Sequence, residues 1–402
     1  MTDASAGQHF PCGSCGAPAM QYDASVGAMR CPYCNHTQAV AQQAQPQAAP
    51  QPQAPEAQQG QAPAQPAPQG PPGPGGAVER RLEEGIAQER SGAGGAGFGT
   101  ATRSMRCQTC GATVAFSDAA IATKCDFCGS QHVLEQQSQR NVIRPESLVP
   151  FAVNDQIAKQ KFQEWLGSGF FRPSNLSSAA SLGQISGVYV PYWTFDCGVD
   201  SQWRAESGHH YYETVVEAQV VDGQKREVKR QVQKTRWQPA QGHRRDRYDD
   251  VLVVASKGLP EPIANRLATF DTNALVPYDP RYLAGFHAEE YAVGLEEGWQ
   301  KADQRIRRDQ DSRCQRDIPG DTHRNFQSQH QLYEQTYKHV LLPLWIAAYR
   351  YQDKTFRFLV NGQTGEVQGE APTSWFKVVM VIAIVVAIIA GIVFAVRASK
   401  GG

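Results

Sequence analysis

Residues 187–203 read GVYVPYWTFDCGVDSQW, and this stretch decides the fold of the largest part of the chain. It is dominated by β-branched and aromatic side chains, which are typical of a β-strand. Residues 211–221 and 224–237 continue the pattern, and the dipeptide between them, Asp222-Gly223, is typical of a tight hairpin turn. The sequence therefore predicts a strand followed by a long β-hairpin.

Further elements are expected around these strands. Residues 249–256 predict another strand, and Asn361-Gly362 marks a hairpin turn further on. We therefore expect residues 145–370 to form one α+β domain of mainly antiparallel strands. Helices are predicted at residues 154–166, 259–269 and 288–308.

Eight of the ten cysteines form four CxxC pairs. Fifteen residues separate the first two pairs and fourteen separate the last two. Each CxxC presents two thiolates on a tight knuckle, and two knuckles can close a tetrahedron around Zn²⁺. Because protein fills all four positions, we predict two structural zinc ribbons, at residues 8–40 and 103–136. The predicted zinc ligands are Cys12, Cys15, Cys31, Cys34, Cys107, Cys110, Cys125 and Cys128.

Disulfide bonds are the alternative for these cysteines, and they would suit an exported chain. Residues 1–30 contain no apolar core of a signal peptide. The two further thiols, Cys197 and Cys314, fit a reducing compartment. We therefore expect zinc rather than disulfides, and we expect the bulk of the chain to lie in the cytosol.

Residues 41–100 are rich in Gln, Pro, Ala and Gly. Such a composition cannot bury a core, and it predicts a disordered linker. Residues 78–90 are a candidate short helix within it. We expect this linker to let the first ribbon move independently of the second.

Residues 378–396 read VVMVIAIVVAIIAGIVFAV, nineteen positions without a charge. At about 1.5 Å per residue, such a helix spans roughly 28 Å, close to the bilayer core of about 30 Å. Trp375 and Phe376 suit the membrane interface. We predict a single-pass, tail-anchored protein of the inner (cytoplasmic) membrane. Arg397 and Lys400 favour the opposite orientation, because the positive-inside rule alone would keep the C-terminal end in the cytosol. A re-entrant segment, with both ends in the cytosol, is the alternative.

Common catalytic signatures are missing. The sequence has no P-loop, GxSxG, HExxH or kinase motif. We therefore predict that the protein is not an enzyme and has no small-molecule substrate. Its formal net charge is zero, so the chain as a whole has no long-range attraction for nucleic acid.

A cluster of cations nevertheless follows the predicted hairpin turn. It could bind anionic lipid headgroups or nucleic acid, or it could be a solvated strand edge that resists aggregation. Its members are Lys225, Arg226, Lys229, Arg230, Lys234, Arg236, Arg244, Arg245 and Arg247.

Several stretches resemble one family of bacterial zinc-ribbon membrane proteins. They are GVYVPYWTFDC, KTRW, DDVLVVAS, YLAGFHAEEY and LLPLWIAAYRYQDKTFRFLVNGQTGEVQGE, behind a CxxC ribbon. Members are often labelled TFIIB-type zinc-ribbon proteins, or primosomal-protein-N′/superfamily II helicase-like. The resemblance covers residues 107 to about 376 and the apolar span, and it implies metal ligation by Cys107, Cys110, Cys125 and Cys128. The helicase motor in that label has no counterpart in this sequence.

Two functional hypotheses follow. Some members of that family resemble partners of phage-shock-protein-A and SPFH-type membrane-stress proteins. By that resemblance, the chain is expected to be a membrane-anchored adaptor that recruits cytosolic proteins to the inner membrane. The alternative is a nucleic-acid-binding accessory factor for replication or a helicase, tethered to the membrane.

Overall fold

A computed structural model describes most of the chain. It covers residues 10–40, 79–92, 98, 103–116, 124–137, 143–179, 181–182, 185–221, 224–267, 269–352 and 354–400. Most of the predicted linker, including residues 41–78, lies outside this part. The helices are α1 (Leu82–Ser91), α2 (Asp155–Gly167), α3 (Leu176–Ala179), α4 (Glu261–Arg266), η2 (Thr272–Ala274), η3 (Pro280–Leu283), α5 (Leu295–Arg316) and α6 (Trp375–Lys400).

The strands form two sheets. The small sheet contains β1 (Gln21–Asp23), β2 (Ala28–Arg30) and β3 (Thr37–Gln38). All other strands join the large sheet: β4 (Arg80–Arg81), β5 (Arg103–Cys107), β6 (Thr113–Phe116), β7 (Val133–Gln137), β8 (Ser147–Leu148), β9 (Ser181–Leu182), β10 (Ser186–Val221), β11 (Gln224–Val254), β12 (Val276–Pro277), β13 (His287–Glu289), β14 (Thr322–Tyr351), β15 (Lys354–Asn361) and β16 (Val367–Gly369).

Three very long strands dominate the large sheet. β10 lies between β11 and β14 and is antiparallel to both. The predicted strand at 187–203 and hairpin after it are confirmed, since Val221 pairs with Gln224; the turn residues Asp222-Gly223 lie outside the described part. The run at 249–256, predicted as a separate strand, is instead the end of β11. The pairing is mainly antiparallel, with β10·β13 and β14·β8 parallel.

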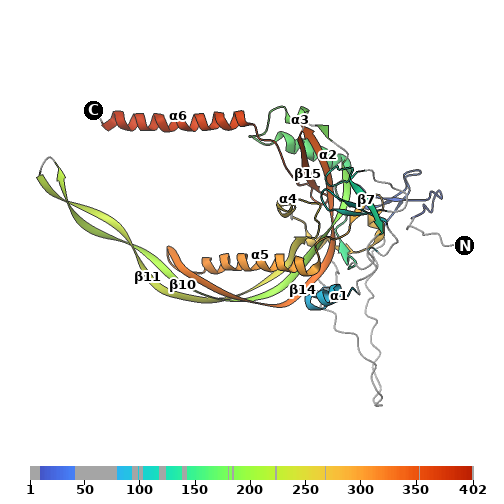
Figure 1. Ribbon diagram of the computed structural model, residues 1–402, viewed down its shortest axis with the longest axis horizontal. Coiled ribbons are helices and arrows are strands. Elements are labelled where there is room, and N and C mark those ends of the chain that lie inside the picture. Colours follow the sequence, from blue (N-terminus) through green and yellow to red (C-terminus); the bar gives the residue numbers. More distant parts are fainter. Residues whose placement is uncertain are drawn as a thin grey trace, which may run out of the picture.

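The distal hairpin projects from the domain as a curved arm (Figure 1). β14 pairs with β10 only as far as Gly208, opposite Thr322. Beyond this point β10 and β11 continue as two strands alone. We call residues 209–221 and 224–236 the arm. Its described side chains are mostly exposed, among them Tyr212 at 67% and Val216 at 51%.

Near the base of the arm, glycines let aromatic side chains of one long strand lie across the backbone of its neighbour. A Cβ at Gly198 would lie 2.2 Å from the Tyr333 ring, and one at Gly242 would lie 2.4 Å from the Trp203 ring. The register also shifts between Asp196 and Gly198. Bulges and glycines of this kind bend a sheet, and the cross-strand aromatic side chains stabilise it where glycine has no side chain.

Helix α5 packs along this ribbon (Figure 1). Its buried side chains, such as Ala302 and Ile306, join a core cluster with Phe195 and Val199 of β10. The helix begins later and ends later than the predicted 288–308, because His287–Glu289 pair with β6 and β10 as β13.

The remaining core lies at the globular end of the molecule. Asn154 caps α2 by accepting a hydrogen bond from the Ile157 amide at 2.9 Å, as such residues do at helix starts. Phe162 of α2 stacks on Phe358 of β15 with ring centroids 3.6 Å apart. The predicted hairpin after Asn361 is confirmed as β15 and β16. The chain therefore combines two cysteine clusters, a mixed sheet-rich domain and one apolar C-terminal helix.

Candidate metal centres

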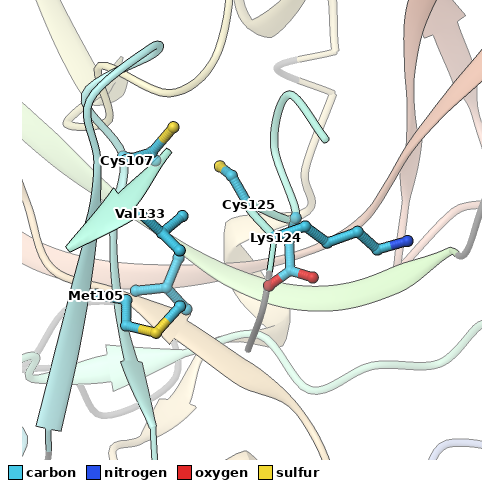
Figure 2. A pocket seen from close by; sticks show the side chains of 8 residues that line it. Met105, Cys107, Lys124, Cys125 and Val133 are labelled. Atoms are coloured by element: carbon cyan, nitrogen blue, oxygen red, sulfur yellow. The ribbon is translucent and has the colours of Figure 1, made fainter. Parts of the chain in front are cut away.

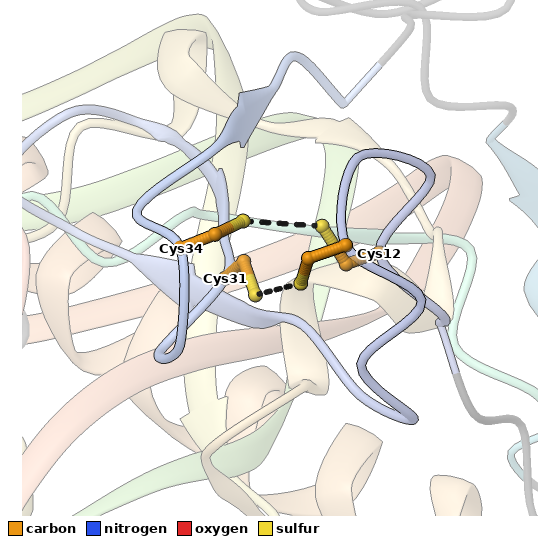
Figure 3. A group of neighbouring side chains, drawn as sticks. Cys12, Cys31 and Cys34 are labelled. Atoms are coloured by element: carbon orange, nitrogen blue, oxygen red, sulfur yellow. Dashed lines mark hydrogen bonds between the residues drawn. The ribbon is translucent and has the colours of Figure 1, made fainter.

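The first cysteine cluster brings together Cys12, Cys15, Cys31 and Cys34. Their four sulfur atoms lie within 4.8 Å of one another. The Sγ atoms of Cys12 and Cys34 are 3.6 Å apart, as are those of Cys15 and Cys31, and Figure 3 shows the two knuckles facing each other. Four sulfurs at about 2.3 Å from a zinc ion would be roughly 3.8 Å apart, so this donor set fits Zn²⁺.

The second cluster has the same geometry. The Sγ atoms of Cys107 and Cys128, and those of Cys110 and Cys125, are again 3.6 Å apart. Figure 2 shows Cys107 and Cys125 on facing segments beside Met105 and Val133. All eight predicted ligands are thus brought together in two groups of four that could each hold one zinc ion.

The local sequence explains these knuckles. After each CxxC, one residue adopts a left-handed backbone, and its amide donates to the carbonyl of the first cysteine. Glycine and asparagine adopt this conformation most readily. The four residues are Gly16, Asn35, Gly111 and Gly129.

Backbone amides favour the thiolate of one cysteine in each cluster, whereas contacts with the other sulfurs and burial raise the pKa of Cys15, Cys125 and Cys128. Burial raises the pKa of the Cys31 thiol, but the amides of Cys34 and Tyr33 donate to its sulfur and lower the pKa to about 6. In the second cluster, Cys107 has the same balance: burial raises its pKa, and the amides around it lower it to about 7. The thiolate is the form that binds metal.

The second centre is built into the domain. Its strand β6 pairs with β13, which pairs with β10. Phe127, within the Cys125–Cys128 knuckle, is 1% exposed and packs against Gly258. Asp126 accepts hydrogen bonds from the Ser186 hydroxyl and from His287, each at 2.8 Å.

The first centre also lies against the domain, contrary to the expectation that it moves independently. The Tyr22 amide donates to the Ala284 carbonyl at 2.9 Å. The Tyr22 ring meets Tyr282 edge-on, with centroids 5.2 Å apart. Tyr22 and Met20 are buried in one core cluster with residues of the large domain. This docking was missed because no sequence pattern links residues 20–22 to residues 282–284.

Among the residues that the structure describes, several side chains of the predicted cationic cluster pair with carboxylates. Arg244 and Arg245 bind Asp246 and Asp200, at 2.6 and 2.8 Å. Arg247 pairs with Glu334, and Lys234 with Glu213. Arg236 lies over the Tyr211 ring at 5.5 Å. Lys229 and Arg230 are exposed on the arm, and the side chains of Lys225 and Arg226 lie outside those described.

One charged site was missed by the sequence analysis. The Lys338 ammonium is 1% exposed and lies 2.8 Å from Asp250 and 3.5 Å from both Asp196 and Glu79. Burial raises the pKa of Asp196 to about 7, although Lys338 opposes this shift. Lys338 lies three residues before the apolar run LLPLW, and a charge close to such a run is the available signal. One ammonium is shared by three carboxylates, so the group is a buried ion-pair network that keeps an excess of acidic groups.

Beyond its first turn, the apolar helix α6 lies away from the core. Among the described residues, Trp375–Ala395 is the one stretch long and apolar enough to cross a membrane, and none of it is buried. Trp375 and Phe376 are 75% and 79% exposed. A soluble protein would bury such a helix, so its exposure supports the predicted membrane span.

Comparison with known proteins gives one informative match. The chain is 29% identical over 327 residues to the uncharacterized protein YdjG of Bacillus subtilis strain 168, a match that covers 68% of this chain and 92% of that protein. No family model matches the chain. No solved structure matches it either. The similarity in sequence therefore extends over nearly all of YdjG.

Proposed function

We propose that this protein is a non-enzymatic adaptor, anchored in the inner membrane by α6, that recruits cytosolic proteins to the membrane. Both metal centres would hold structural Zn²⁺, since each offers four protein sulfurs and no open coordination position is needed. In this role the two metal centres would stabilise the segments that surround them. The bulk of the chain would lie in the cytosol, where thiols stay reduced.

The observation that carries the proposal is the arm together with the exposed helix. A two-stranded hairpin is marginally stable on its own in water. The arm extends beyond the point where β14 stops pairing with β10, and it still exposes Tyr211, Tyr212 and Val216, at 39%, 67% and 51%. Tyr212 and Val216 share one face of the strand, because side chains alternate between faces, and we propose that this face contacts the partner. A partner that packs on the arm would be held near the bilayer by α6.

The partners we propose are membrane-stress proteins of the phage-shock-protein-A or SPFH type, as the family resemblance implies. The resemblance to TFIIB-type zinc-ribbon proteins belongs to the same proposal. The alternative of a nucleic-acid-binding factor has weaker support, because Lys234, Arg244 and Arg245 are engaged with carboxylates.

The test is mild crosslinking of the full-length protein in its native host, followed by purification in detergent and identification of bound proteins. The membrane-bound fraction of each partner is then measured in three strains: wild type, a deletion of residues 375–402, and Tyr212→Ser with Val216→Ser. The adaptor proposal predicts that both changes release the partner into the cytosol. Membrane recruitment that persists in both strains would refute it.

A nuclease-treated sample separates the two hypotheses. Partners that an adaptor binds directly should survive the treatment. Retention of DNA or RNA that weakens steeply with salt, with partners lost after nuclease treatment, would favour the nucleic-acid hypothesis. Ile157→Ser is a matched control for the arm variants, because Ile157 is 42% exposed but lies on α2, outside the arm and both metal centres.

A further inference from the structure

A short loop next to α6 exposes two aromatic rings. The loop joins α2 to α3, and Phe170 and Phe171 are 63% and 46% exposed. Their rings meet edge-on, with centroids 5.2 Å apart. They do not contribute to the core, although large aromatic side chains in a soluble protein are usually buried.

The loop has a defined conformation. Arg172 stacks on the Trp165 ring at 3.9 Å and donates to the Trp165 carbonyl. The Arg172 amide closes a turn by donating to the Gly169 carbonyl at 3.1 Å. These contacts tie the loop to α2 while both phenylalanine rings remain exposed.

The same loop contacts the first turn of α6. The Ser374 amide donates to the Phe171 carbonyl at 2.7 Å. The Lys377 ammonium donates to the Arg172 carbonyl at 2.9 Å. Segments about two hundred residues apart in the sequence are thereby joined at the point where the apolar helix leaves the domain (Figure 1).

We propose that the Phe170-Phe171 loop inserts into the interfacial layer of the bilayer that α6 spans, as a second membrane contact of the domain. This rests on the proposed membrane anchor. Four exposed aromatic side chains, from Phe170, Phe171, Trp375 and Phe376, gather beside Arg172 and Lys377 at one end of an apolar helix. Aromatic rings with nearby cations are the composition that membrane–water interfaces favour.

The lipid interface is the occupant that this geometry favours over a protein partner. The loop lies in contact with α6, whose exposed apolar side chains are suited to lipid rather than to water. It touches α6 at the first turn, which stays at the interface whatever the tilt of the rest of the helix. Two contacts instead of one would stop the domain from rotating freely and would set the direction in which the arm points.

The test uses the full-length protein reconstituted in vesicles of phosphatidylcholine and phosphatidylglycerol. A photoreactive p-benzoylphenylalanine replaces Phe170 in one variant and Phe171 in a second, so that the result does not depend on one site. Two reference variants carry it at Phe394 within α6 and at Tyr33, which are 77% and 76% exposed. Lipid adducts are counted by mass spectrometry after illumination.

We expect adducts at positions 170 and 171 with a yield comparable to that at 394 and severalfold above that at 33. Adducts at 394 without adducts at 170 and 171 would overturn the inference and leave the membrane anchor intact. Protein–protein adducts at 170 and 171 in place of lipid adducts would assign the loop to a partner and also overturn it. Absence of lipid adducts at 394 would refute the membrane anchor itself.

Discussion

Removal of one zinc ligand should affect the domain differently in the two metal centres. We consider Cys125→Ser in the second centre and Cys31→Ser in the first. Each variant should lower the zinc content from two ions to one, because structural sites need all four ligands. The two centres differ in which contacts with the large domain depend on them.

The contacts allow the difference to be estimated. At the second centre, loss of the knuckle removes the buried Phe127 ring, worth about 3–5 kcal/mol by analogy with Phe→Ala changes. It also removes two hydrogen bonds to Asp126, worth about 1.5–3 kcal/mol each if charged. At the first centre, the buried Met20 and Tyr22 side chains are worth about 1.5–3 kcal/mol each, and one backbone hydrogen bond adds about 1 kcal/mol, but its strands β1 to β3 form a separate sheet, whereas β6 of the second centre is paired into the large sheet. A domain is stable by only about 5–15 kcal/mol.

We therefore expect Cys125→Ser to open the domain and Cys31→Ser to release only the first centre. The assay is amide hydrogen exchange, read by mass spectrometry on full-length protein in detergent, with zinc content measured in parallel. Exchange in β13 and in residues 186–195 should rise strongly in the Cys125 variant alone. Cys314→Ala is the control, because Cys314 is buried but is no predicted ligand. Equal exchange in β13 for both ligand variants would refute the reasoning.

Four further predictions follow from individual contacts. Gly242→Leu should destabilise the pairing of β10 and β11 by about 1–3 kcal/mol, because a Cβ there meets the Trp203 ring. Gly167→Ala is the control, because a Cβ at Gly167 has open space, and limited proteolysis of both variants would check the difference. Burial raises the pKa of Glu289 from 4.5 to about 8. The folded state therefore keeps a proton that the unfolded state loses, and the free energy of unfolding falls as pH rises between these two values. At pH 7 the loss should reach roughly 3 kcal/mol relative to pH values below 4.5. Glu289→Gln should abolish that fall, and urea midpoints that keep the wild-type pH slope would contradict it. Lys338→Met should cost about 3–5 kcal/mol by leaving buried carboxylates unpaired, and adding Asp250→Asn should recover part of the lost urea midpoint. On insertion into vesicles, a spin-label distance between residues 212 and 397 should change from its value in the structure, and an unchanged distance would exclude perpendicular insertion of α6.

The parts of the fold that sequence predicts are those with local causes. The CxxC spacing predicts both sulfur clusters because each knuckle is closed by its own backbone, with Gly16 or Asn35 in the left-handed conformation. The apolar run of α6 and the hairpin of β10 and β11 are likewise local patterns. These elements were recognisable without knowledge of any contact distant in the sequence.

The parts that sequence missed depend on long-range contacts. The start of α5 was placed too early because His287–Glu289 pair with strands far away in the chain, which overrides a helical pattern. The carboxylate partners of Arg245 and Arg247, Asp200 and Glu334, come from other strands of the sheet, β10 and β14. Docking of the first centre through Tyr22 has the same origin. In each case the decisive neighbour is distant in the sequence, which a linear pattern does not show.

The arm constrains how α6 can enter a membrane. Both leave the domain on the same side (Figure 1). If α6 crossed a bilayer along its normal in this orientation, the arm would be carried into the same layer, with charged side chains such as Glu213 and Lys234. Charged groups are expensive in hydrocarbon, so the angle between α6 and the arm must change on insertion. The segment between β16 and α6 is short, and the Phe171 contact to Ser374 holds its end. We expect this turn beside the Phe170-Phe171 loop, because the loop would then stay at the interface while the arm swings along the membrane surface or away from it, where a partner could reach it.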